Sequence, residues 1–130
     1  MNTKWILTAS ALILGAAGLT GTFAPDEFLA ATGIPSTGIT PLLVQLLAAA
    51  LLGFAMVNWM AKDSLMGGIY NRPLAVGNLL HFTVSAITLI KLVMHGASPA
   101  LIVATVIYTL LAIAFSAIVF GPGIKTPASA

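Results

Sequence analysis

The residues of this sequence that could do chemistry in an apolar environment lie mostly on one stretch, residues 73–95. On a helix at about 100° per residue, its polar side chains project within an arc of about 100°, with Lys91 just beyond the edge. These side chains are Asn78, His81, Ser85, Thr88 and His95. Amides and imidazoles placed in this way hydrogen-bond to neighbouring helices or contact a ligand.

Polar residues from several stretches sort into two clusters when their depth is counted at about 1.5 Å per residue. The inner cluster, toward the predicted cytoplasmic side, contains Asn58, Asn78, His81 and Ser116. The outer cluster contains Gln45, Thr88, Lys91 and His95. Lys91 and His95 are close enough to the end of their stretch to reach the lipid headgroups, so anchoring is the favoured interpretation.

His81 is different because it sits roughly two turns in from the end of its stretch. A neutral imidazole there can bond to Asn58, Asn78 or Ser116 and hold helices together, which is the favoured interpretation. The alternative is contact with a ligand or the handling of a proton. The inner cluster is therefore interpreted as a site of helix packing or ligand binding, and the outer cluster as a second group of polar residues.

No cofactor, metal or catalytic group is expected. His81 and His95 are 14 residues apart, a spacing typical of bis-histidine haem sites, but two stacked haems need four histidines and the chain has two. A dimer or a partner would have to supply the others. Cysteine is absent and the three acids, Asp26, Glu27 and Asp63, lie outside the apolar runs, which argues against metal sites and paired-carboxylate catalysis. Small multidrug transporters use a glutamate in their first span, which this chain lacks.

The elements that position these residues are four long apolar runs, at about residues 5–23, 41–61, 73–95 and 99–121. The chain is 59% hydrophobic, with a mean hydropathy of +1.08, and each run is long enough to cross about 30 Å of hydrocarbon. Lys4, an apolar run and Gly15-Ala16-Ala17 are also typical of a secretory signal, but we expect a retained first span. The prediction is an all-α, up-down-up-down bundle of four transmembrane helices.

Local signals refine this bundle. Thr40 and Ser98 precede prolines and are predicted N-caps. Small residues four apart predict close helix packing, at Ala11/Gly15, Ala17/Gly21, Ala49/Gly53 and Ala112/Ser116. Between the first two spans, Pro25-Asp26-Glu27 and Gly33 predict a short helix at the outer interface, resting on headgroups or, alternatively, docking a partner.

Basic residues near the span ends predict the orientation. Lys4, Lys62, Arg72 and Lys125 fall on one side, so both termini are expected in the cytoplasm and the protein in the cell (inner) membrane. The aromatic residues Trp5, Trp59 and Tyr70 are predicted to anchor the same side. A net charge of +2 on scattered residues forms no basic patch, so nucleic acid is not an expected partner.

Three segments resemble small bacterial four-helix membrane proteins of the DoxX-like group. They are Phe23-Ala24-Pro25-Asp26, Thr32-Gly33-Ile34-Pro35 and the stretch 72–80 with Gly77-Asn78-Leu79-Leu80. The resemblance covers about residues 10–120, implies a bundle that accompanies redox or other membrane complexes, and supplies no catalytic residues.

The function expected from these observations is non-enzymatic. An accessory, assembly or structural subunit is favoured, with lipids and other transmembrane subunits or a second copy as partners. The alternative is a binder or carrier of a lipophilic small molecule (a quinone, lipid or pigment) along the polar stripe of residues 73–95.

Overall fold

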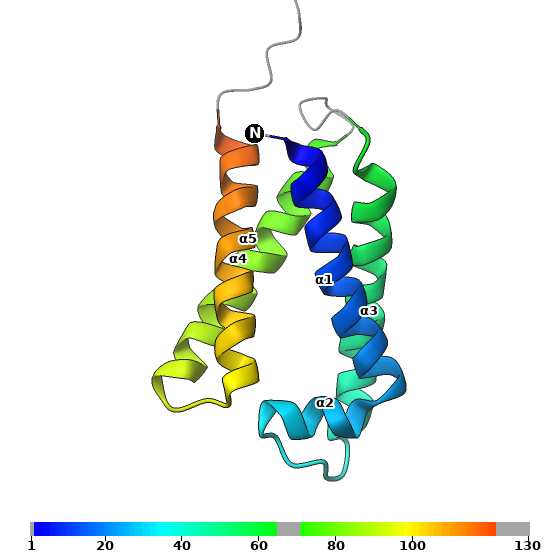
Figure 1. Cartoon of the computed structure of the whole chain (residues 1–130), viewed down its shortest axis with the longest axis vertical. Coiled ribbons are helices and arrows are strands. Elements are labelled where there is room, and N and C mark those ends of the chain that lie inside the picture. The colour runs from blue at the N-terminus through cyan, green and yellow to red at the C-terminus, as the bar shows by residue number, and fades with distance from the viewer. Residues whose placement is uncertain (1, 65–70, 122–130) are drawn as a thin grey trace, which may run out of the picture.

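A computed structural model describes residues 2–64 and 71–121 (Figure 1). Within them lie helices α1 (Thr3–Phe23), α2 (Pro25–Thr32), α3 (Thr40–Ala61), α4 (Arg72–Met94) and α5 (Pro99–Phe120). All except α2 are long and apolar enough to cross a membrane. The predicted all-α fold with four spans is confirmed, and each predicted span agrees with its helix to within two residues. The protein is an integral membrane protein.

Prolines and small polar residues set where the helices begin. Each of α2, α3, α4 and α5 has a proline at its first or second position, where the missing N–H has no partner within the helix. Ser98 is the N-cap of α5, and its Oγ accepts a hydrogen bond from the Leu101 N–H at 3.4 Å. The prediction for Thr40 is wrong. α3 begins at Thr40 itself, whose hydroxyl donates to the carbonyl of Thr37 at 2.8 Å in the preceding turn.

Helices α1 and α3 pack closely along a shared seam. Buried residues recur three or four apart on both, at Leu7, Ala11, Leu14, Gly18 and Gly21 of α1 and at Val44, Ala48, Leu51, Ala55 and Asn58 of α3. A Cβ added at Gly18 would lie 2.7 Å from Leu52 Cγ and 3.0 Å from the Ala48 carbonyl oxygen. Gly18 therefore permits a backbone approach that any side chain would block. The predicted pair Ala49/Gly53 lies instead on the exposed face of α3.

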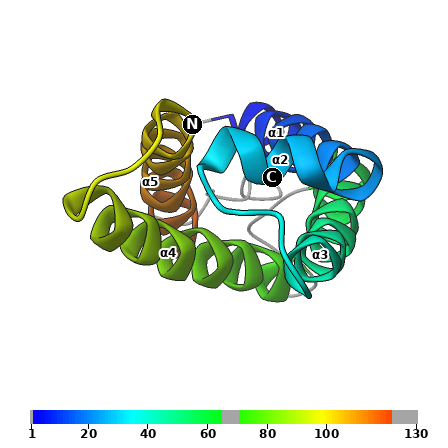
Figure 2. The same ribbon diagram turned by 90° about the horizontal axis from the view of Figure 1, so that it is seen from below.

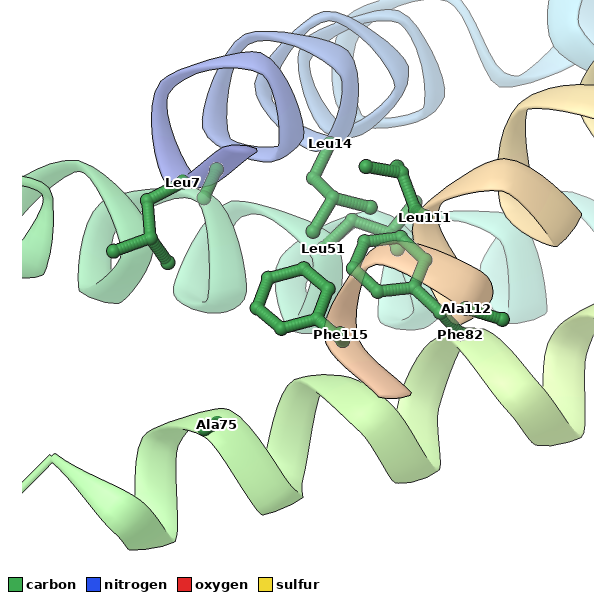
Figure 3. Close-up of a cluster of buried hydrophobic side chains, with 9 residues drawn as sticks. Leu7, Leu14, Leu51, Ala75, Phe82, Leu111, Ala112 and Phe115 are labelled. Atoms are coloured by element: carbon green, nitrogen blue, oxygen red, sulfur yellow. The ribbon is translucent and has the colours of Figure 1, made fainter. Parts of the chain in front are cut away.

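Seen along the helices, α1, α3, α4 and α5 form a ring, and α2 lies across one end (Figure 2). Their common core contains the fully buried Phe82 and Phe115, whose rings stack at 5.5 Å beside Leu14, Leu51 and Leu111 (Figure 3). Because α4 is tilted, it starts beside α3 and leaves it toward the end where α2 lies (Figure 1).

The short helix predicted after the first span is confirmed as α2. Its Leu29 is 2% exposed, and the helix packs against α1, α3 and α5. Gly33, with φ of 75°, ends it in the left-handed conformation that favours glycine. Thus α2 joins the α1–α3 pair to the start of α5 at the end where the outer membrane interface is predicted.

Candidate functional site

The centre of the inner cluster is a reciprocal pair of amides between α3 and α4. Asn58 Nδ2 donates to Asn78 Oδ1 at 2.7 Å, and Asn78 Nδ2 donates to Asn58 Oδ1 at 2.7 Å. Asn58 Nδ2 also donates to Ser10 Oγ of α1 at 3.0 Å, while Asn78 Nδ2 donates to the Leu74 carbonyl at 3.0 Å. All three polar side chains are 0% exposed. We call Ser10, Asn58 and Asn78 the amide network.

The amide network uses every donor hydrogen of its side chains. Each amide has two donor hydrogens, and both are engaged, while each amide oxygen accepts from the opposite side chain. Ser10 in turn donates to the Leu7 carbonyl at 2.9 Å. Hydrocarbon supplies no competing water, so this arrangement holds α1, α3 and α4 in one register.

Ser10 belongs to the amide network, although neither the inner nor the outer predicted cluster contains it. The periodicity of the first span could have predicted it, because Ser10 falls between Leu7 and Leu14 on the buried face. Ser10 lies seven residues after the start of α1, whereas Asn58 lies three residues before the end of α3. The buried face of the first span, rather than depth counted from the helix ends, identifies Ser10.

His81 lies beside the amide network but takes no part in it. Its Nε2 is buried and has no hydrogen-bond partner within residues 2–64 and 71–121. Instead the ring stacks on Phe54 with centroids 4.8 Å apart and planes at 25°, and it meets Phe82 and Tyr108 at 5.0 and 5.7 Å. The bonds to Asn58, Asn78 or Ser116 expected for a packing histidine are not formed.

A shallow groove of about 480 Å³ opens on the side of the bundle, away from its core, beside His81. We call it the His81 groove; its lining residues are Phe54, Gly77, Leu80, His81, Val84 and Ser85. It runs along α4 opposite Phe54 of α3. A Cβ added at Gly77 would meet no atom within 4 Å, so the groove is open there. His81 lies nine residues after Arg72, the first residue of α4, or about 13 Å along the helix axis, so the groove lies well inside the candidate span.

The remaining predicted site residues are not joined to one another by hydrogen bonds. Ser116 donates to the Ala112 carbonyl of its own helix at 2.8 Å, and Thr88 donates to Val84 in the same way at 2.9 Å. Gln45 reaches only the Thr22 carbonyl of α1, at 3.5 Å. The outer residues Lys91 and His95 are exposed. A role for the outer cluster stays a prediction.

Charged groups at the end where α1 begins interact with each other and with an aromatic ring. Lys4 Nζ lies 2.7 Å from Asp63 Oδ1, and that hydrogen bond, with the charges of Lys4 and Lys62, lowers the pKa of Asp63. Lys62 Nζ lies 3.1 Å from the centroid of Trp59. Trp5 is 69% exposed at the same end, as an anchor should be, whereas Tyr70 and Lys125 fall outside the described residues.

Nothing in the described part of the chain groups three or more histidine or acidic side chains in a way that could hold a metal ion. The two imidazoles of the haem hypothesis differ in setting, since His95 is exposed at the end of α4 and His81 faces its groove. Comparisons with protein-family models, curated proteins and solved structures find no match to this chain. The resemblance to DoxX-like proteins therefore stays a prediction.

Proposed function

We propose that this membrane protein is non-enzymatic and that it binds a lipophilic small molecule in the His81 groove. One observation carries the proposal. A buried imidazole nitrogen lacks a partner at a depth where no water is at hand to replace it. An unsatisfied polar group in an apolar medium is costly. The imidazole that carries it lines the His81 groove beside Ser85, so a ligand oxygen or hydroxyl in the groove would find polar side chains there.

The dimensions of the His81 groove favour a small molecule over a partner helix. Its lining on α4 extends from Gly77 to Ser85, eight residues or about 12 Å along the axis. A spanning partner helix would need a contact surface of up to about 30 Å. The volume of about 480 Å³ falls within the range of roughly 300–1,000 Å³ typical of small-molecule sites.

A second candidate function is that of an accessory or assembly subunit of a larger membrane complex or a homo-oligomer. Ala49 and Gly53 support it, since both lie on the exposed face of α3 and a Cβ added at Gly53 would meet no atom within 4 Å. Small residues on an outward face allow close approach of another helix. The two functions are compatible because the groove and this face use different surfaces.

We also propose that the protein resides in the cell (inner) membrane with both termini in the cytoplasm. Support comes from Lys4, Lys62 and Arg72, which all lie at the end of the bundle where α1 begins and α5 ends (Figure 1).

The test of binding compares two histidine variants of the protein purified in mild detergent. Native mass spectrometry and organic extraction should find a stoichiometric lipophile on the wild type and on His95→Ala, which changes the exposed histidine. His81→Ala should lose the molecule while keeping its thermal unfolding temperature within a few degrees. Equal retention by all three proteins, or no bound molecule in any of them, would contradict the proposal. Larger partners that co-migrate with the wild type on native gels would support the accessory role.

A further inference from the structure

We infer that the molecule bound in the His81 groove is a neutral lipid whose flat ring carries oxygens at opposite ends, as in an alkylated benzoquinone or hydroquinone. The inference rests on the proposed function and adds the chemistry of the ligand. It follows from the aromatic wall, the absence of charge in the lining, and the spacing of the two polar side chains.

The aromatic wall favours a ring. Phe54 and His81 form a stacked pair at 4.8 Å from two different helices, and Tyr108 closes in on the His81 ring from α5. Stacked and edge-on aromatic arrangements contribute energy beyond their apolar area, and a straight acyl chain cannot use that contribution. A flat ring in the groove would therefore extend an existing cluster of rings.

The charge and depth of the His81 groove favour a neutral molecule. None of its lining residues in the described ranges carries a formal charge. A phosphate group placed there would have no counter-charge in the lining, about 13 Å along α4 from the start of the span, and an isolated ion is very costly in an apolar medium. Phospholipid headgroups are thereby disfavoured, although phospholipid tails are free to cover the groove when it is empty.

Two polar side chains line the groove one helical turn apart. His81 and Ser85 are four residues apart on α4, so they lie on the same face and are separated by about 6 Å along the axis. A ring with one oxygen at each end can lie against the His81 imidazole and the Ser85 hydroxyl together. Leu80 and Val84, which are 64% and 55% exposed, then offer an apolar track for the tail of the lipid.

The decisive experiment uses the fact that the chain has only two histidines. The full-length protein is labelled with ¹⁵N in its imidazoles and placed in nanodiscs, where it gives two sets of ring signals. The variant His95→Ala keeps only the set of His81 and so assigns both. A decyl benzoquinone should move the His81 nitrogen signals saturably and leave those of His95 unchanged, because a hydrogen bond to an imidazole nitrogen alters its shielding. Dodecanol and dioleoyl phosphatidylglycerol are the ring-free probes and should leave both sets in place.

Substitutions of two phenylalanines test the stacking. Phe54→Leu keeps an apolar side chain in the wall but removes the ring, and should weaken quinone binding about two- to tenfold. Phe120→Leu is the matched control, because Phe120 is 80% exposed at the far end of α5, and it should bind as the wild type does. Ser85→Ala should weaken binding of the quinone, which has two oxygens, but leave binding of an alkyl phenol, which has one oxygen, unchanged.

The outcomes separate the two proposals. If dodecanol moves the His81 signals as strongly as the quinone, the groove binds lipophiles but the inferred ring chemistry is wrong. If no probe moves them, both the inference and the proposed function fail. Equal effects of Phe54→Leu and Phe120→Leu would also overturn the role of the aromatic wall.

Discussion

Replacing Asn58 by leucine is the most direct test of what holds the four spans together. Leucine has a shape similar to asparagine, so the substitution removes polar atoms without opening a large cavity. Asn58 is 0% exposed, and the change deletes its bond to Ser10 and both bonds of the reciprocal pair with Asn78. It also leaves Asn78 Oδ1 buried without that donor.

The expected loss can be worked out from these bonds. Interhelical hydrogen bonds in membranes contribute about 0.6 kcal/mol each on average, so three of them amount to about 2 kcal/mol. A buried acceptor left without its donor costs about 1–3 kcal/mol in protein interiors, which moves the expectation upward. We expect Asn58→Leu to lower the free energy of unfolding by about 2–4 kcal/mol.

Unfolding in mixed micelles with increasing dodecyl sulfate, followed by tryptophan fluorescence, measures this loss. Gln45→Leu is the matched control on the same helix. Its amide is exposed and makes a single long contact of 3.5 Å with the Thr22 carbonyl. An exposed substitution of this kind should change the free energy of unfolding by less than about 0.5 kcal/mol.

A double-mutant cycle with Asn78→Leu isolates the reciprocal pair, because it cancels the transfer free energies of the individual side chains. Because two bonds join the amides, we expect the double variant to lose less free energy of unfolding than the two single variants lose in sum, by about 1 kcal/mol. If the single effects simply add, or if Gln45→Leu costs as much as Asn58→Leu, the amide network does not stabilise the bundle and the reasoning is refuted.

Three further predictions concern packing, charge and orientation. Gly18→Ala should destabilise the fold by about 1–3 kcal/mol in the same assay, because its Cβ meets atoms of α3 closer than contact distance, whereas Gly53→Ala, with open space, should not. The pKa of Asp63 is lowered from 3.8 by its hydrogen bond and charge interaction with Lys4. This ion pair therefore stabilises the fold above about pH 3.8, and the stabilisation is lost as the pH falls further. When unfolding midpoints are measured from pH 6 to pH 3, the midpoint of Asp63→Asn should fall slightly less than that of the wild type. Reporter proteins fused to the two ends of the chain should both appear in the cytoplasm, and opposite compartments would disprove an even number of crossings.

The spans were predictable because several local signals agree at each boundary. Apolar runs of the right length end at residues that helices do not continue through, and prolines such as Pro41, Pro73 and Pro99 stand where only a helix start tolerates them. The N-cap prediction for Thr40 was wrong because a threonine beside a proline is favoured both as an N-cap and in a turn, and here its hydroxyl bonds within the turn.

Packing faces were harder to predict from the sequence. Ala49 and Gly53 have the spacing of an interface, yet α3 turns the seam Val44, Ala48 and Leu51 toward α1. In a membrane, lipid and protein are equally apolar, so hydropathy does not distinguish the two sides of a helix. The close contacts at Gly18 and Gly21, which depend on the shapes of both helices, select the side.

The candidate site shows the same limit for hydrogen bonds. Depth along the spans predicts Asn58, Asn78 and His81 in one cluster, and the structure joins Asn58 and Asn78 by hydrogen bonds. Which residues pair depends on the donors and acceptors that each has. Two amides facing each other satisfy both their oxygens and donate all their hydrogens, with the help of Ser10 and the Leu74 carbonyl.

His81 stands apart from the amide network. Both hydrogens of each amide are used within the network, so Asn58 and Asn78 have no N–H left to donate to the imidazole. The imidazole stacks instead among rings beside an open groove, and its buried Nε2 has no partner among the described residues. A histidine that served only to pack helices would be better replaced there by an apolar residue, since an unsatisfied buried nitrogen destabilises the fold. The unpartnered nitrogen therefore supports the proposal that a ligand occupies the His81 groove.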